Sequence, residues 1–160
     1  LGLRHGGWCP KGRRAEDGPI SRRYRLTETP SRSYAQRTKW NVRDSDGTLI
    51  VYRGAVNGGT LLTLRVARET YAKPVFVLST EKRVDVNRFL AWLARNHIRT
   101  LNVAGPRESK RPGIHAAATE ALGKLLARRN GTETLTPEPR IARGWSRLNR
   151  IVLSIVERSA

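Results

Sequence analysis

Residues 48–60 read TLIVYRGAVNGGT, an apolar run followed by a glycine-rich turn. The run is continuous rather than alternating, which is typical of a strand buried on both faces of a parallel sheet. The turn ends in Gly58-Gly59-Thr60, and a helix is predicted from Gly59 to about Tyr71. Because a helix N-terminus presents backbone N–H groups and the positive end of the helix dipole, the turn predicts a phosphate-binding loop.

The residue types in this turn suit an anion. Glycine lets the backbone approach a ligand without a Cβ between them, and the Thr60 hydroxyl can donate a hydrogen bond. An ordinary tight turn between a strand and a helix is the alternative interpretation.

The same alternation of strand and helix continues downstream. Strands are predicted at 75–78 and 100–104, and helices at 85–96 and 114–128. This pattern predicts an α/β fold, a Rossmann-like parallel sheet with flanking helices. Right-handed crossovers then place the loops after Tyr52, Leu78 and Ala104 at one edge, where open α/β sheets bind ligands.

The loop after the strand at 100–104 carries the second candidate site. It contains Gly105, Pro106, Arg107, Glu108 and Ser109. Arg107 could hold an anion through two hydrogen bonds. Glu108 could pair with Arg107, accept a sugar hydroxyl or act as a base, and a solvated loop without a function is the alternative.

The length of 160 residues predicts one domain, assigned to 1–129, followed by a linker and an amphipathic helix within 130–160. Apolar side chains at helical spacing place that helix at 145–157. Upstream, residues 5–30 predict a long loop, and Ser31 is expected to cap a helix that ends near Arg43.

The formal net charge is +18, from 31 Lys and Arg against 13 Asp and Glu. These charges are spread along the chain, so solvated arginine-rich faces and a basic nucleic-acid-binding module both remain open, with the former favoured. The single cysteine, Cys9, excludes an internal disulfide and indicates a reducing, cytoplasmic compartment. The longest apolar runs are too short to span a membrane. His5, His97 and His115 lack partners at metal-ligand spacing, so no protein-ligated metal is predicted.

Four blocks, in order along roughly residues 2–127, resemble the putative molybdenum carrier family, also described as circularly permuted YpsA-like proteins of the SLOG superfamily. The blocks are residues 6–18 (GGWCPKGRRAEDG), residues 34–38 (YAQRT) with Asn41 and Asp46-Gly47-Thr48, Gly58-Gly59-Thr60, and residues 102–109 (NVAGPRES).

The resemblance implies a Rossmann-like fold that binds a nucleotide or molybdenum cofactor (molybdopterin), and it implies a homo-oligomer. It adds Arg13 and Arg37 as residues that neutralise ligand charge, and Asn41 and Asp46 as further candidates. From the residues alone, Asp46 favours a turn role at the opposite edge of the sheet. Relatives begin with a strand, a glycine-rich loop and a helix, so the chain is expected to lack the first strand, that loop and most of that helix.

The leading hypothesis is a protein that binds a small phosphate-bearing ligand. Its phosphate would lie against Gly58, Gly59 and Thr60. The alternative is an enzyme of the phosphoribohydrolase type with Glu108 or Asp46 as the acid–base group. Related hydrolases carry a glutamate shortly after the glycine turn, whereas residues 61–65 here are LLTLR. No catalytic residue is therefore assigned.

Overall fold

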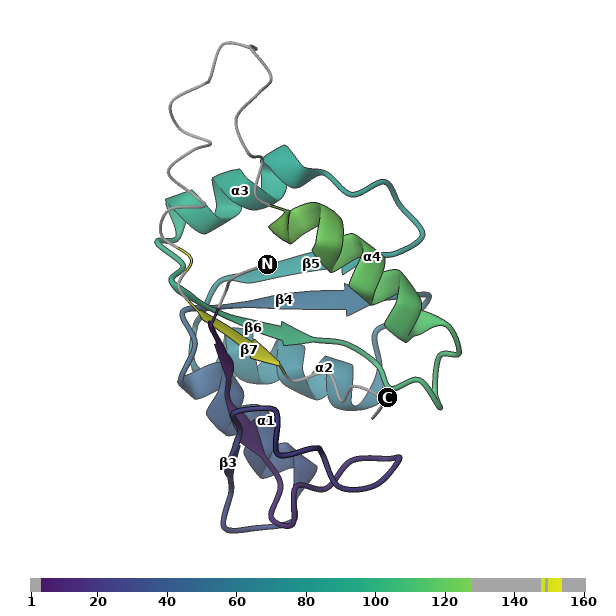
Figure 1. Cartoon of the computed structure of the whole chain (residues 1–160). Helices are drawn as coiled ribbons and strands as arrows, with labels where there is room; N and C mark the ends of the chain where they lie inside the picture. Colours follow the sequence, from purple (N-terminus) through teal and green to yellow (C-terminus); the bar gives the residue numbers. More distant parts are fainter. Residues whose placement is uncertain (1–3, 128–147, 149, 154–160) are drawn as a thin grey trace.

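A computed structural model describes residues 4–127, 148 and 150–153, and these build a parallel five-stranded sheet (Figure 1). The strands lie in the order β1-β7-β6-β4-β5. Every neighbouring pair is parallel. Their bounds are Arg4–Gly6 for β1, Gly47–Tyr52 for β4, Val75–Ser79 for β5, Thr100–Ala104 for β6 and Arg150–Leu153 for β7.

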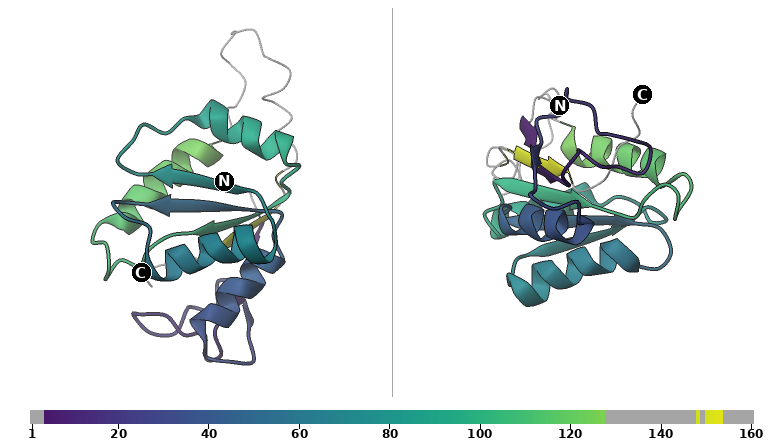
Figure 2. Two further views of the ribbon diagram at one scale, coloured as in Figure 1. Left: turned by 180° about the vertical axis from the view of Figure 1, so that it is seen from behind. Right: turned by 90° about the horizontal axis from the view of Figure 1, so that it is seen from below.

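Helices cover both faces of this sheet. The α-helices of the described residues are α1 (Tyr34–Arg43), α2 (Gly58–Arg65), α3 (Val86–Arg95) and α4 (Ile114–Leu126). Figure 2 shows α4 on one face of the sheet and α1 and α2 on the other. Helix α2 continues directly into a π-helical turn, η1 (Val66–Thr70). The fold is therefore a three-layer, Rossmann-like α/β fold, as the sequence predicts.

The main core lies between the sheet and the helices α3 and α4. Phe89 on α3 is fully buried, and its ring packs against Phe76 of β5 with the centroids 5.3 Å apart. Leu49 and Val51 of β4 belong to the same core cluster. Because side chains alternate along a strand, Thr48 and Ile50 face the α1 and α2 side. There the Asn102 side-chain amide donates to the Thr48 hydroxyl at 3.3 Å.

The chain leaves β4 and β6 toward opposite faces of the sheet. After β4 it forms α2 on one face, and after β6 it forms α4 on the other. β4 and β6 are neighbours, so their carboxyl ends diverge at a topological switch point. Open α/β sheets bind ligands at such crevices. The loop after β5 leads to α3, which packs in the same core as α4.

The predicted strands at 48–52, 75–78 and 100–104 and the three helices that follow them are confirmed. The helix near residues 31–43 is also confirmed, but its N-cap is Ser33 rather than Ser31, with the Ser33 hydroxyl accepting from the Gln36 N–H. Within the loop predicted at 5–30, three short strands occur: β1, β2 (Trp8–Cys9) and β3 (Thr27–Glu28).

The predicted C-terminal helix is wrong at Arg150–Leu153, which form β7. This strand lies inside the sheet between β1 and β6, so residues beyond 129 contribute to the domain assigned to 1–129. The apolar run at residues 151–153 is compatible with a strand as well as a helix, and two neighbouring strands supply its backbone hydrogen-bond partners. The predicted linker and the remainder of that helix fall outside the described residues, apart from Leu148, which is buried in the main core.

None of the helices in the described part of the chain is both long and apolar enough to cross a membrane.

Candidate functional site

A cavity of about 480 Å³ opens at the switch point between β4 and β6. Three segments line it: the N-terminal half of α1, the turn into α2, and the loop after β6. Its lining residues are Tyr34, Ala35, Arg37, Thr38, Asn57, Gly58, Gly59, Thr60, Leu62, Thr63, Ala104, Gly105, Pro106, Arg107 and Lys110. The topology thus brings together four parts of the sequence prediction: Gly58-Gly59-Thr60, Arg37, Gly105-Pro106 and Arg107.

The turn into α2 presents backbone donors to this cavity. The N–H groups of Gly58 and Gly59 make no hydrogen bond with any residue that the structure describes. Asn57 is the N-cap, but its side chain forms no cap hydrogen bond. Gly58 has a φ of +51°, a left-handed conformation that favours glycine. A Cβ at Gly59 would meet no atom within 4 Å, so the backbone here borders open space.

Arg37 brings a buried positive charge to the cavity from α1. The residue is only 8% exposed. Burial, together with the nearby positive charge of Arg107, lowers the pKa of Arg37 to about 10. A bound anion would favour the charged guanidinium and so oppose this shift.

Three guanidinium groups surround the ring of Tyr34. Their central carbons lie 4.4 Å from the ring centroid for Arg107, 5.2 Å for Arg14 and 5.9 Å for Arg37. Aromatic faces attract such cations, and Tyr34, Arg37 and Arg107 all line the cavity, so positive charge is concentrated beside this ring. Lys110 adds a further cation to the lining. No carboxylate is among the described residues that line the cavity, so this part of its lining is strongly positive.

The segment at 11–27 forms a fixed loop next to the cavity. The Arg13 guanidinium holds it by donating to the backbone carbonyls of Ile20, Ser21, Tyr24 and Leu26. From this loop the Glu16 carboxylate reaches the rim of the cavity, where it accepts from Arg107 at 3.4 Å and from the Ser109 hydroxyl at 2.6 Å.

Several residues predicted to contact a ligand do not line the cavity. Arg13 organises its own loop, and Ser109 donates to Glu16. The Glu108 carboxylate accepts from the N–H groups of Gly113 and His115, at the start of α4. These contacts occupy its oxygens at a helix N-terminus, where a negative charge is favourable.

Asn41 and Asp46 also make contacts within the fold. Asn41 is fully buried, and its amide exchanges two hydrogen bonds with the Trp8 backbone. Asp46 accepts from the N–H groups of Arg99 and Thr100 at the start of β6, at the amino edge of the sheet. This is the edge opposite the cavity, as the position of Asp46 before its strand indicates.

The sequence did not identify Tyr34 or Glu16 as site residues. It placed Asn57 and Lys110 within the two candidate loops but assigned neither of them a contact with the ligand. Tyr34 and Glu16 lie in sequence blocks that resemble the family, and this position was the one indication in the sequence that they could belong to the site. A tyrosine or a glutamate in such a block has many structural uses, however, and only the folded chain brings Tyr34 next to Arg107.

Cys9 is 1% exposed, and burial raises the pKa of its thiol, as expected for a structural cysteine. Within residues 4–127, 148 and 150–153, no three His, Cys, Asp or Glu side chains cluster in a way that could hold a metal ion.

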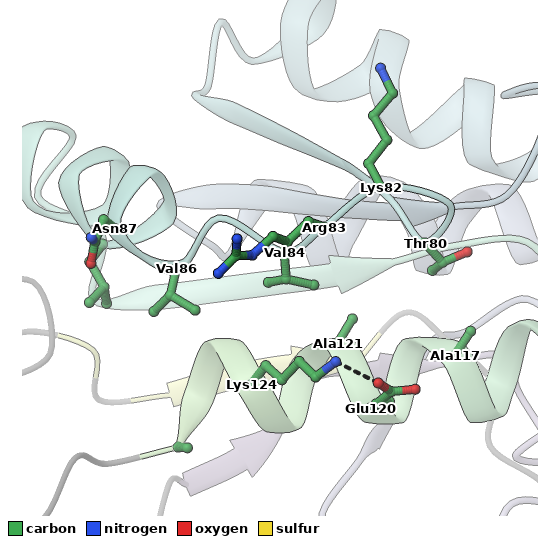
Figure 3. Close-up of a pocket in the computed structure, with 12 residues that line it drawn as sticks. Thr80, Lys82, Arg83, Val84, Val86, Asn87, Ala117, Glu120, Ala121 and Lys124 are labelled. Carbon is green, nitrogen blue, oxygen red and sulfur yellow. Dashed lines mark hydrogen bonds and ion pairs between the residues drawn. The ribbon is translucent and has the colours of Figure 1, made fainter.

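A second hollow, of about 550 Å³, lies between α3 and α4 (Figure 3). The loop after β5 reaches this second hollow through Thr80. The prediction that this loop lines the same crevice as the loops after β4 and β6 is therefore wrong. On α4, Lys124 and Glu120 form an ion pair beside this hollow. None of the predicted site residues lines it, and its apolar part is formed by side chains such as Val84 and Val86.

Comparison with known proteins agrees with the fold. A crystal structure of a putative molybdenum carrier protein from Syntrophus aciditrophicus SB is similar to this chain, with 41% sequence identity and a TM-score of 0.70. The similarity covers 76% of this chain and 78% of that one. A search of curated proteins found no match. The circularly permutated YpsA SLOG family matches residues 1–126. The chain therefore belongs to the circularly permutated YpsA SLOG family.

Proposed function

We propose that the protein binds a small phosphate-bearing ligand, a nucleotide or a molybdenum cofactor, in the cavity between β4 and β6. The main support is that Arg37, Arg107 and Lys110 line this cavity, whereas none of the described lining residues carries a carboxylate. The N–H groups of Gly58 and Gly59 add donors at the start of a helix, where phosphates bind in many α/β proteins.

The dimensions and chemistry of the cavity suit such a ligand. Small-molecule sites typically enclose about 300–1,000 Å³, and this cavity of about 480 Å³ lies in that range. The lining offers cations and backbone donors, which hold a phosphate. The protein would therefore hold a molybdenum cofactor through its phosphate, and the related structure of a putative molybdenum carrier protein supports this ligand class.

Binding without catalysis is the function that these residues favour. A phosphoribohydrolase would use Glu108 or Asp46 as its acid–base group, but the Glu108 carboxylate is hydrogen bonded at the start of α4 and Asp46 lies at the other edge of the sheet. We therefore propose a carrier or binding protein. A cytoplasmic homo-oligomer is the form that the family resemblance and the single cysteine favour.

Gly59→Ala tests the site directly. A Cβ at Gly59 meets no atom within 4 Å, so the variant should fold with unchanged or slightly higher stability. The added methyl group would occupy space at the helix N-terminus that an anion needs. We expect AMP, as the probe, to bind about tenfold more weakly by isothermal titration calorimetry, a cost of about 1.4 kcal/mol.

Gly123→Ala is the matched control. Gly123 is also a helical glycine, on α4, where an added Cβ would meet no atom within 4 Å, and it does not line the cavity. Its AMP affinity should equal that of the wild type. Thermal unfolding with and without AMP and molybdopterin provides a second measurement, since a ligand of the native state raises the unfolding temperature. Equal AMP affinities for the two alanine variants would contradict a phosphate site at Gly59.

A further inference from the structure

The carboxylate of Glu16 contacts the guanidinium of Arg107, which would bind the ligand according to the proposed function. It accepts from Arg107 at 3.4 Å, and its second partner is the Ser109 hydroxyl at 2.6 Å. These contacts join residues more than 90 positions apart in the sequence. Glu16 therefore brings a negative charge to the rim of a cavity where the lining residues within 4–127 carry none.

The surrounding loop fixes the position of this carboxylate. Glu16 lies in a turn closed by the Ala15 N–H donating to the Gly18 carbonyl at 3.1 Å. Arg13 pins the loop through backbone carbonyls, and the Gly12 N–H donates to Glu28 at 2.6 Å. Glu16 is thus presented by an anchored loop, which limits the entropy lost when the contact forms.

Arg107 does not depend on Glu16 alone for its position. Its guanidinium also packs on the Tyr34 ring, with its central carbon 4.4 Å from the ring centroid. Removing the negative charge of Glu16 would therefore leave Arg107 beside the cavity and raise the positive potential there.

We propose that Glu16 is a counter-ion on Arg107 that lowers the affinity of the site: an anionic ligand competes with it for Arg107, and its negative charge weakens the binding of that ligand. This inference rests on the proposed function. Glu16 makes the binding free energy of a ligand less favourable in proportion to the ligand's negative charge, because the repulsion energy between two charges scales with their product. The carboxylate thus weakens the binding of dianions more than that of monoanions.

The test compares Glu16→Gln with the wild type, using AMP and 3′,5′-cyclic AMP as probes at pH 8 and low salt. AMP carries a phosphate monoester close to a dianion at this pH, whereas the cyclic diester is a monoanion. Two unit charges about 6 Å apart in a water-like medium change an affinity about threefold, so E16Q should bind the cyclic nucleotide about threefold and AMP about tenfold more tightly. Low salt keeps screening small.

Glu120→Gln is the control, because it removes the same charge from an exposed ion pair on α4 and should change neither affinity. Glu16→Ala should tighten binding in the same order as E16Q, since both variants remove the charge. Weaker or unchanged AMP binding by E16Q, or equal gains for the two nucleotides, would overturn the role of Glu16. Failure of both the wild type and E16Q to bind either nucleotide would instead contradict the proposed function.

Discussion

Arg37→Met is expected to weaken the binding of AMP about 30-fold, or by about 2 kcal/mol, the loss typical of a hydrogen bond to a buried charged group. Arg37, at 8% exposure, is the most buried of the described cations that line the cavity. A phosphate next to it would be screened little by water, so its charge contributes more than that of exposed Arg107 or Lys110. Methionine keeps the length and apolar stem of the side chain and removes the charge.

Arg95→Met provides the control for this variant. Arg95 is exposed in the last turn of α3, on the other face of the sheet, and its substitution changes the net charge equally. Calorimetric titration of both variants with AMP, with circular dichroism to verify folding, measures the difference. If Arg37→Met folds and its AMP affinity lies within twofold of that of Arg95→Met, Arg37 makes no contact with the phosphate.

Gly7→Ala is expected to lower the free energy of unfolding by about 3 kcal/mol or more, because backbone strain and overpacking add. Gly7 has a φ of +129°, which side chains other than glycine rarely adopt. A Cβ there would lie 2.7 Å from a methyl carbon of Val152 and 2.9 Å from the Asn41 amide oxygen. The substitution therefore disturbs the contact between β7 and the N-terminal segment.

Gly12→Ala separates these two causes. Gly12 also has a positive φ, +76°, but no atom lies within 4 Å of the position of its Cβ. Its cost should be about 1 kcal/mol, from backbone conformation alone. Urea denaturation of both variants gives the comparison. If Gly7→Ala were no more destabilising than Gly12→Ala, the result would contradict the close packing of Val152 against Gly7.

Most of the fold could be predicted because its elements have strong local patterns. Residues 48–52 form a continuous apolar run bounded by turns, and α3 has a distinct apolar stripe that ends in the buried Leu93. β7 could not be predicted in this way. Apolar residues from 145 to 155 satisfy a helical spacing, and the strand at Arg150–Leu153 depends on pairing with β1 and β6, which are distant in the sequence.

The location of the candidate site followed from topology, whereas individual side-chain roles did not. A parallel sheet brings the turn at Gly58-Gly59 close to the loop at Gly105–Arg107, whatever the details of packing. The role of Arg13, by contrast, could not be predicted, because the sequence alone does not distinguish it from an arginine that binds an anion. Its four carbonyl partners exist only because residues 20–26 fold around it.

A titration of ¹⁵N-labelled protein with AMP, followed by amide NMR, tests the central claim most directly. We expect the largest shifts at the amides of Gly58, Gly59 and Thr60, with smaller shifts in the loop at Gly105–Arg107, because the phosphate would lie against the start of α2. Another cluster of cations, formed by Arg4, Arg25 and Arg150 with His5, surrounds a separate hollow. Shifts confined to that cluster, with Gly58 and Gly59 unchanged, would contradict a phosphate site between β4 and β6.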